Sequence, residues 1–334
     1  MRDKNIFKNK TFMITGGTGS FGSQMAKTLL KLDIKKLIIF SRDEFKQYEM
    51  KKTFSDSKYR CMRFFLGDVR DLNRLNLAFK DVDYVFHAAA LKQVDTAEYN
   101  PFEFINTNII GAQNVIGAAL NNNIKKIIAL STDKASSPVN LYGATKLCSD
   151  KLFISANNIT GKQDIKFSVL RYGNVMFSRG SILPVLLEKH KKNENFEITD
   201  ARMTRFNIEL NQAINLSINC LKSMHGGEIF VPKLKTYKVM DLAKAINIKN
   251  KLKIIGIRPG EKIHEEMISS ADSLNTFELK NSFVIVDPLN KKLNIKYKKF
   301  RKMKSNHSYN SFDNPDYLNK IQLQKIIKKY TKNV

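Results

Sequence analysis

The sequence is poor in cysteine and acidic residues, and it lacks a long apolar run. Its three cysteines, Cys61, Cys148 and Cys220, include no CxxC pair and have no histidine close by. Their isolation argues against a zinc site and against a disulfide framework. No segment approaches about 18 consecutive apolar residues, and the charged stretch Met1–Lys10 lacks the apolar core of a signal peptide. We therefore expect a cytoplasmic protein without a metal or a membrane span.

Acidic residues are outnumbered by basic ones, 31 against 57, which gives a formal net charge of +26. Such an excess is found in proteins that bind the phosphate backbone of nucleic acids. The lysines are scattered among Asn and Ile residues, however, and do not gather with aromatic residues as in a nucleic-acid groove. The charge favours small anionic ligands such as diphosphates, and we expect no nucleic-acid partner.

Short apolar runs alternate with helical segments in the first half of the 334 residues, and they lie at Phe12–Thr15, Lys36–Phe40, Met62–Leu66, Tyr84–His87, Lys126–Ser131 and Phe167–Tyr172. Fully apolar strands separated by helices are typical of a parallel sheet covered on both faces. The predicted fold class is α/β, a Rossmann-type doubly wound parallel sheet with a smaller C-terminal substrate-binding region.

The strict alternation ends near Asn174, which suggests the domain organisation. We predict a Rossmann domain over 1–174 and a mainly substrate-binding region over 175–288, with some return to the Rossmann domain. Residues 289–334 form a Lys-rich tail with a terminal helix. Asn314-Pro315 offers an N-cap and a first-turn proline for that helix. One apolar helix face is expected to dock on the body through Leu323, Ile326, Ile327 and Tyr330.

A glycine-rich turn joins the first predicted strand to the first helix. Gly16, Gly19 and Gly22 have the GxxGxxG spacing, which lets the backbone approach a pyrophosphate at a helix N-terminus. The strand–turn–helix setting distinguishes this segment from a simple turn. We predict a dinucleotide site whose first contacts are Gly16, Thr18, Gly19, Ser20, Phe21 and Gly22.

The tip of the second strand indicates which dinucleotide binds. Ser41 and Arg42 stand about 20 residues beyond the glycines, where a carboxylate usually holds a free ribose 2′-hydroxyl. This pair favours a 2′-phosphate and hence NADP, although Asp43 leaves NAD open because its carboxylate can accept from the ribose. His87 is interpreted as a core histidine. Further predicted cofactor contacts are Lys46, Asp68, which is placed to accept from the adenine amine, Val69, Ala88 and Ala89.

Tyr142 and Lys146 follow the fifth strand at the start of a helix, where residues i and i+4 share a face. A cation beside a phenol favours the phenolate and turns a group of pKa about 10 into a usable base. We expect both residues to act in catalysis and to contact the cofactor. Together with the glycine turn, this YxxxK pattern resembles the extended branch of the short-chain dehydrogenase/reductase superfamily.

Thr132, Asp133 and Lys134 end the fifth strand just before the tyrosine. A hydride-transfer enzyme needs only the Thr132 hydroxyl, whereas an adjacent acid and amine add a second proton-transfer pair. Elimination of water requires such a pair. Once C4 of a hexose is oxidised, neutral Lys134 can remove the C5 proton while protonated Asp133 gives a proton to the departing C6 hydroxyl.

Longer runs resemble the inverting UDP-N-acetylglucosamine 4,6-dehydratases, within them the type that opens pseudaminic acid biosynthesis. The resemblance extends from Lys10 to Pro288 and includes TGGTGSFG, FSRDEFKQ, STDKASSPVNLYGATKLCSDKLF and IIGIRPGEKIHEEMI. The Asp133-Lys134 pair is its most specific element, because the retaining sugar dehydratases carry Asp-Glu there.

The resemblance implies an activity on UDP-N-acetylglucosamine. Lys134 is the base toward C5, Asp133 the acid toward C6, and Tyr142 takes the C4 hydroxyl proton. The implied product is UDP-2-acetamido-2,6-dideoxy-β-L-arabino-hex-4-ulose, the first step toward pseudaminic acid-type sugars for surface glycans or flagellin glycosylation. NADP is regenerated in each turnover, and a homo-oligomer, dimer or hexamer, is expected. The implied substrate contacts are Lys92, Asn174, Ser181, Thr199, Arg205, Arg258 and Glu261.

The sequence departs from the family pattern at Gln93 and Asp95, where His and Pro are usual, at Phe177, usually Gly, and at Asn207, usually Trp. A ring at Phe177, beside Asn174, is expected to reshape the sugar pocket. Two alternatives stay open: a nucleotide-sugar 4-epimerase or 5-epimerising dehydratase of the same fold, and a non-catalytic NADP-binding regulator. The intact catalytic set argues against the regulator.

Overall fold

The computed structural model describes residues 6–54, 58–178, 180–247 and 252–331. Within these ranges the central sheet has ten strands in the order β16-β14-β15-β10-β6-β5-β4-β1-β2-β3. The strands from β3 to β10 run parallel, and β15, β14 and β16 extend that edge antiparallel. Their bounds are β1 Thr11–Thr15, β2 Lys36–Ser41, β3 Met62–Leu66, β4 Tyr84–His87, β5 Lys126–Thr132, β6 Lys166–Tyr172, β10 Glu228–Pro232, β14 Thr276–Glu278, β15 Ser282–Val286 and β16 Arg301–Lys302.

The order β3-β2-β1-β4-β5-β6 is that of a Rossmann fold, which confirms the predicted fold class. Each of the six predicted strands forms within one residue of its expected bounds. Strands β1 and β4 are buried at every position, as their uninterrupted apolar sequences require.

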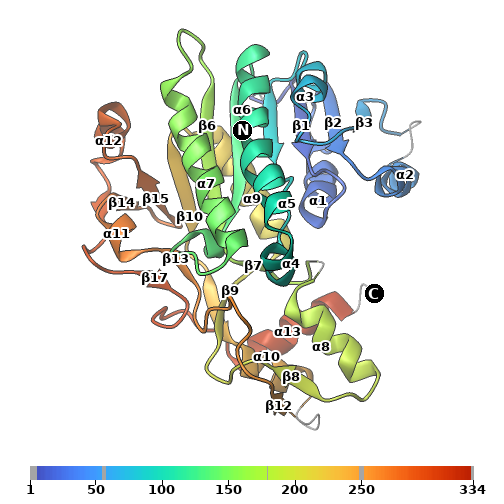
Figure 1. Ribbon diagram of the computed structural model, residues 1–334, viewed down its shortest axis with the longest axis vertical. Helices are drawn as coiled ribbons and strands as arrows, with labels where there is room; N and C mark the ends of the chain where they lie inside the picture. Colours follow the sequence, from blue (N-terminus) through green and yellow to red (C-terminus); the bar gives the residue numbers. More distant parts are fainter. Residues whose placement is uncertain (1–5, 55–57, 179, 248–251, 332–334) are drawn as a thin grey trace.

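Helices cover both faces of the sheet, with α6 and α7 in front and α9 behind in Figure 1. On one face, α3 packs on α6 and α6 on α7; on the other, α1 packs on α9. A run of α4, α5 and a π-helix leads from β4 into α6. The bounds are α1 Ser20–Leu29, α2 Glu44–Thr53, α3 Leu72–Ala78, α4 Val94–Tyr99, α5 Pro101–Phe104, the π-helix Ile105–Ile110, α6 Gly111–Asn121, α7 Leu141–Ser155 and α9 Leu210–Ser223.

A second hydrophobic core lies beyond the sheet, at the bottom of Figure 1. Leu183, Phe196 and Leu242 are fully buried in it, as is Leu323 near the end of the chain. It is built from α8 Ile182–Lys191, β8 Phe196–Ile198, α10 Val239–Ile246, β12 Leu252–Ile254 and α13 Lys320–Thr331. Three short strands connect it to the sheet, β7 Asn174–Val175, β9 Thr204–Ile208 and β11 Lys235–Lys238, and β13 Glu266–Ile268 pairs with β17 Tyr309–Asn310.

The terminal helix α13 docks by the predicted face, since Leu323 and Ile327 are buried and Ile326 packs beside them. Its predicted start at Asn314-Pro315 is wrong, because α13 begins at Lys320. Asn314 instead donates its side-chain amide to the carbonyl of Leu234 at 2.7 Å. The segment that follows pairs with β11, so Asn319 takes the capping role and accepts from the Gln322 amide at 2.9 Å.

Across the described ranges, no helix combines the length and the apolarity needed to cross a membrane. Within the same ranges, no three His, Cys, Asp or Glu side chains form a group that could hold a metal ion. Cys61, Cys148 and Cys220 are free thiols.

Candidate active site

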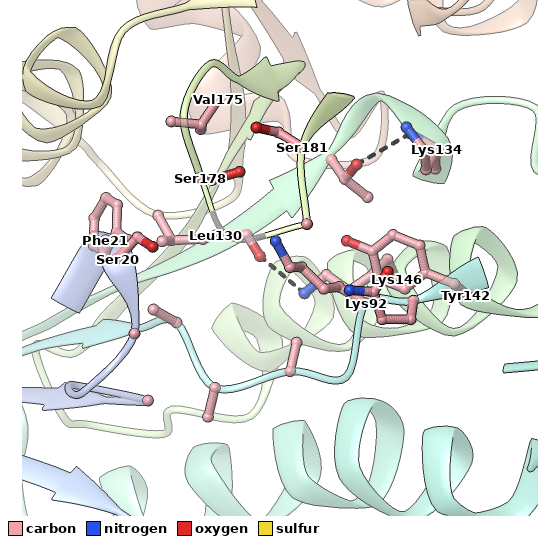
Figure 2. Close-up of a pocket in the computed structure, with 18 of the residues that line it drawn as sticks. Ser20, Phe21, Lys92, Leu130, Lys134, Tyr142, Lys146, Val175, Ser178 and Ser181 are labelled. Carbon is pink, nitrogen blue, oxygen red and sulfur yellow. Dashed lines mark hydrogen bonds between the residues drawn. The ribbon is translucent and has the colours of Figure 1, made fainter. Parts of the chain in front are cut away.

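A cavity of about 800 Å³ opens at the carboxyl ends of the parallel strands, where Rossmann folds bind their ligands. It brings together side chains from both halves of the chain, and Figure 2 shows ten of them labelled. Of the predicted site residues, Asp133 and Thr199 do not line it. Those that do are Gly16, Thr18, Gly19, Ser20, Phe21, Gly22, Ser41, Arg42, Asp43, Lys46, Asp68, Val69, Ala88, Ala89, Lys92, Thr132, Lys134, Tyr142, Lys146, Asn174, Ser181, Arg205, Arg258 and Glu261.

Two glycines of the glycine turn, Gly16 and Gly22, have no room for a side chain. Gly16 has φ +65°, and a Cβ there would lie 2.8 Å from the Ala89 backbone. A Cβ on Gly22 would lie 2.4 Å from the carbonyl oxygen of Gly17, so α1 could not begin so close to β1. The N-terminus of α1 therefore faces the cavity, an arrangement that fits a pyrophosphate.

The tip of β2 carries the predicted ribose contacts. The Ser41 hydroxyl lies 2.9 Å from that of Thr18, which ties the tip to the glycine turn. Asp43 caps α2, because its Oδ1 accepts from the Lys46 amide at 2.8 Å while Oδ2 pairs with the Lys46 ammonium. Both oxygens of this carboxylate are therefore engaged within α2.

Arg42 stands at the rim of the cavity with half of its side chain exposed. Its guanidinium lies 3.8 Å from Asp68, whose carboxylate also accepts from Arg70 at 2.8 Å. Burial works to raise the pKa of Asp68, but these arginines, Arg70 foremost, hold it below its ordinary value. Asp68 is thus a charged acceptor, and Arg42 is a guanidinium available at the rim.

His87 is the core histidine that the sequence suggested. It is 2% exposed, and its Nδ1 lies 2.7 Å from the Thr15 hydroxyl. Burial, with a smaller contribution from the ammonium of Lys146, lowers its pKa to about 3. His87 is therefore neutral at physiological pH and supports the strand ends without taking part in proton transfer.

Tyr142 and Lys146 lie in the first turns of α7, whose N-cap Asn140 accepts from the Gly143 amide at 2.7 Å. Lys146 Nζ donates to the Leu130 carbonyl at 2.8 Å, a contact drawn in Figure 2. Burial lowers the pKa of Lys146, and nearby Asp150 opposes this.

The phenol of Tyr142 is buried against the cavity, and burial raises its pKa to about 12. The ammonium of Lys134 and a hydrogen bond with Thr132 act in the opposite direction and favour the phenolate. The sequence suggested Lys146 as the cation that activates the tyrosine. In the structure, the ammonium of Lys134 also works to lower the phenol pKa, against the larger effect of burial.

Lys134 lies between two buried carboxylates. Its Nζ donates to Asp133 Oδ1 at 3.1 Å and to Glu265 Oε1 at 3.0 Å, and it reaches Asn174 Oδ1 at 3.4 Å. The carboxylate side chains of Asp133 and Glu265 are 0% and 3% exposed, whereas that of Lys134 is 21% exposed toward the cavity. Three acceptors for three ammonium protons indicate a charged Lys134.

Burial and neighbouring charges shift the pKa values of these three groups in different directions. Burial would lower the pKa of Lys134, but the two carboxylates outweigh it and raise that pKa. The pKa of Asp133 is raised by burial first and by the charge of Glu265 second. Burial acts on Glu265 in the same direction, yet Lys134 and Arg205 lower its pKa overall. Asp133 is therefore the carboxyl group most ready to accept a proton.

Asp133 lies behind the cavity wall rather than in it. Its Oδ1 is bonded to Thr132 and Lys134, while its buried Oδ2 has no hydrogen-bond partner among the described residues. Gly173, which lines the cavity, lies close to this oxygen, since a Cβ there would stand 3.3 Å from Oδ2. Gly173 therefore leaves the space beside Oδ2 without a side chain of its own.

The predicted substrate contacts differ in how they lie relative to the cavity. Arg205 lines the cavity but donates to the carbonyls of Thr204 and Ile263 at 2.8 and 2.9 Å. Arg258 is half exposed at the mouth, 4.0 Å from Asp95. Thr199 lies off the cavity, with its hydroxyl 2.9 Å from the sulfur of Met203.

The buried Ser181 hydroxyl, at the start of α8, has no partner among the described residues and lines the cavity with Glu261. Phe177 is not in the cavity wall. Its backbone has φ +66°, and its ring stacks on Tyr330 of α13 with centroids 4.1 Å apart. The expected effect of this ring on the sugar pocket is therefore not direct, because the left-handed backbone turns the side chain toward the second core.

Sequence reasoning missed Glu265, the second carboxylate on Lys134. The signal was present, since Glu265 lies in the quoted run IIGIRPGEKIHEEMI, but three glutamates there are equivalent by sequence. Glu266, the next residue, accepts instead from the hydroxyls of Ser136 and Ser137. Other wall residues that were not predicted as contacts are Gln93, Asn140, Tyr172, Val175, Ser178, Gly180 and Lys262.

Comparison with known proteins places the chain in a family. Residues 12–287 match a family model described as polysaccharide biosynthesis protein. The chain is 51% identical over 331 residues to a Campylobacter jejuni protein named UDP-N-acetylglucosamine 4,6-dehydratase (inverting), covering 96% of this chain and 98% of that one. It is 45% identical over 288 residues to a Rickettsia bellii protein named UDP-glucose 4-epimerase, with 84% of each chain covered.

Among solved structures, Pen from Bacillus thuringiensis matches with a TM-score of 0.89 and 38% identity, over 97% of this chain and 99% of that one. The match extends through both cores, so the cavity lies in a shared architecture. The chain therefore belongs to the polysaccharide biosynthesis protein family, in the extended short-chain dehydrogenase/reductase superfamily, as the sequence motifs indicated.

Proposed function

We propose that this protein is an NADP-dependent, inverting UDP-N-acetylglucosamine 4,6-dehydratase that forms UDP-2-acetamido-2,6-dideoxy-β-L-arabino-hex-4-ulose. The observation that carries the proposal is the hydrogen bond between Lys134, which lines the cavity beside Tyr142, and the buried Asp133 behind the cavity wall. Identity of 51% to the Campylobacter jejuni enzyme of that name supports it. The product would open a route to pseudaminic acid-type sugars.

A nicotinamide dinucleotide is supported by the tight glycine turn, where a Cβ at Gly16 or Gly22 would meet backbone at 2.8 or 2.4 Å, and by the N-terminus of α1, which lines the cavity. Arg42 at the rim supports a 2′-phosphate and therefore NADP. A bound nicotinamide would supply the hydride acceptor for C4 of the sugar and the hydride donor for C6. The side chains proposed to hold the cofactor are Thr18, Ser20, Ser41, Arg42, Asp68 and Lys146.

Tyr142 is the proposed acceptor of the C4 hydroxyl proton. The ammonium of Lys134 and the hydroxyl of Thr132 stabilise its phenolate against the effect of burial on the phenol pKa. Thr132 also stands where its hydroxyl can hold the reacting oxygen of the sugar. Oxidation at C4 makes the C5 proton acidic, which prepares the elimination.

The elimination needs a neutral amine and a protonated carboxyl group. Transfer of one proton from Lys134 Nζ to Asp133 Oδ1, along their 3.1 Å hydrogen bond, produces both without changing the total charge. Lys134 then takes the C5 proton, the C5–C6 double bond forms, and the C6–O bond breaks. Asp133, which is buried behind the cavity wall at rest, must turn toward the cavity to give its proton to the departing hydroxyl, which leaves as water. The pair ends as ammonium and carboxylate, its initial state.

The test is incubation of the purified protein with UDP-N-acetylglucosamine and NADP, followed by mass spectrometry for loss of water. Deuterium from solvent should enter C5 of the product, whose configuration is then read by NMR. Tyr142→Phe should abolish both oxidation and dehydration, whereas Lys134→Met should still form reduced cofactor in a single turnover, more slowly than the wild type because the Tyr142 phenolate loses the Lys134 ammonium. An unchanged substrate after long incubation would sink the proposal.

A 4-epimerase is the second candidate, because the Rickettsia bellii relative carries that name at 45% identity. Epimerisation at C4 leaves C5 untouched, so a product of unchanged mass without deuterium at C5 would establish it. A non-catalytic regulator predicts tight cofactor binding without any turnover.

Arg42→Ala tests the cofactor choice, since it should weaken NADP binding while leaving NAD binding nearly unchanged.

A further inference from the structure

Glu265 is a buried charge beside the proposed proton-transfer pair for which the mechanism above has no use. Its carboxylate side chain is 3% exposed and lies 3.0 Å from the Nζ of Lys134, opposite Asp133. A buried carboxylate costs several kcal/mol unless it is compensated. Glu265 lines the cavity wall and contacts the proposed base directly, so we expect a function that offsets this cost.

The backbone around Glu265 is fixed from a distant part of the chain. Its amide donates to the Ser311 hydroxyl at 2.9 Å, and its carbonyl accepts from the Ser311 amide at 2.7 Å. Ser311 in turn lies 2.7 Å from the Thr204 hydroxyl on β9. Glu265 is thus held on rigid backbone, so its carboxylate can define where the flexible Lys134 ammonium rests.

The two carboxylates on Lys134 differ in their cationic neighbours. Arg205 Nε lies 3.6 Å from Glu265 Oε1, which gives Glu265 two cations. Asp133 pairs only with Lys134 among the described residues. Two carboxylates with environments of this kind divide their roles, one remaining ionised and the other carrying a proton.

We propose that Glu265 is a positioning residue for proton transfer: its carboxylate stays ionised, holds Lys134 Nζ against Asp133, and makes Asp133 the carboxyl group that carries the proton. The catalytic meaning of this assignment rests on the proposed dehydration. Without Glu265, the ammonium would keep only the longer contact with Asn174 besides Asp133 among the described residues, and Asp133 would lose the neighbouring charge that favours its protonated form.

Charged and titratable groups from several elements face Lys134 and Glu265. They are Asp133 beside it in the turn after β5, Lys92 after β4, Tyr142 on α7, Arg205 on β9, Tyr237 on β11 and Lys262 in the loop before β13. Glu265→Gln keeps the size of the side chain and one acceptor oxygen but removes one negative charge from this set. The proton affinities of both Lys134 and Asp133 must then fall.

The first experiment is the pH profile of dehydration for the wild type and for Glu265→Gln. The limb at low pH, where Asp133 of the resting ion pair takes up a proton, and the limb at high pH, where Lys134 loses one, should both move to lower pH by about one unit, a tenfold change in proton affinity. Glu265→Asp keeps the charge and should return both limbs toward the wild-type position. Glu266→Gln is the matched control, and its limbs should not move.

A second experiment needs no turnover. Acylation of lysine amines at varied pH, read by peptide mass spectrometry, reports when Lys134 becomes neutral and reactive. In Glu265→Gln this should happen at lower pH than in the wild type, while surface Lys125 keeps its profile. If the wild type fails to dehydrate the substrate, this readout still tests the effect of Glu265 on Lys134.

Some results would overturn the proposal. A uniform fall in rate without displacement of either limb would make Glu265 a structural residue only. Equal displacement in Glu266→Gln would show a general field effect. An unchanged acylation profile for Lys134 in Glu265→Gln would contradict the proposed contact itself.

Discussion

Replacing Lys134 by methionine should destabilise the protein strongly and in a pH-dependent way. Lys134 is the shared cation of Asp133 and Glu265, whose side chains are 0% and 3% exposed. Methionine keeps the apolar stem, so the loss comes mainly from two buried carboxylates that no longer face the ammonium. Breaking a buried ion pair by removing one partner costs about 3–5 kcal/mol.

The pH dependence follows from the carboxyl groups. Without the ammonium, burial raises their pKa values in the folded protein above the unfolded value of about 4. Such groups destabilise the fold progressively as pH rises above that value. The deficit of Lys134→Met relative to the wild type should therefore be larger at pH 8 than at pH 5.

Chemical denaturation at the two pH values measures the effect. Lys125→Met is the matched control, because Lys125 pairs with Asp83 at 2.7 Å but is 51% exposed, and such surface pairs contribute at most about 1 kcal/mol. A Lys134→Met protein as stable as the wild type at pH 8, or with the same deficit at both pH values, would refute the reasoning.

Three further predictions concern the surroundings of the site. Because the pKa of His87 is about 3 in the folded protein against about 6.5 in the unfolded chain, stability should fall by about 1.4 kcal/mol for each pH unit below 6.5. An NMR titration showing His87 protonated near pH 6 would contradict this. Gly22→Ala should weaken dinucleotide binding at least about tenfold, or about 1.4 kcal/mol, in calorimetry, since its Cβ would meet Gly17 O at 2.4 Å. In Gly117→Ala the Cβ meets only Leu72 at 3.7 Å, so binding should not change. Phe177→Gly should be more stable to denaturant than Phe177→Ala by about 0.5–1 kcal/mol, because both lose the stack on Tyr330 but only glycine relieves the strain of φ +66°. The opposite order would show that the backbone there is not strained.

The parts of the fold that depend on local patterns were predictable from the sequence. The strands from β1 to β6 formed within one residue of expectation, because buried parallel strands require uninterrupted apolar runs. The glycine turn and the start of α7 were likewise predictable, because each is determined by residues that are neighbours in the sequence. The start of α13 was not, since Asn314 is bonded to Leu234, 80 positions away.

Long-range contacts also explain what was missed in the site. Glu265 joins Lys134 across 131 positions, and no local pattern separates it from Glu261 or Glu266. Phe177 was expected at the sugar pocket because it is close in sequence to Asn174, which lines the cavity. Its left-handed backbone conformation instead directs the ring toward Tyr330. NADP preference, assembly into a dimer or hexamer and cytoplasmic location stay predictions.

The hydrogen bonds between Ser311 and Glu265 have a consequence for how the sequences of such proteins can change. Ser311 lies past residue 287, where the family match ends, in a stretch that no motif marks. A gene fusion that replaced this stretch with another relative's sequence would exchange the scaffold of a buried anion while leaving every recognisable motif intact. If Glu265 positions Lys134 as proposed, sequence changes around Ser311 should alter the proton affinity of Lys134, and chimeric proteins should keep the two segments from the same parent.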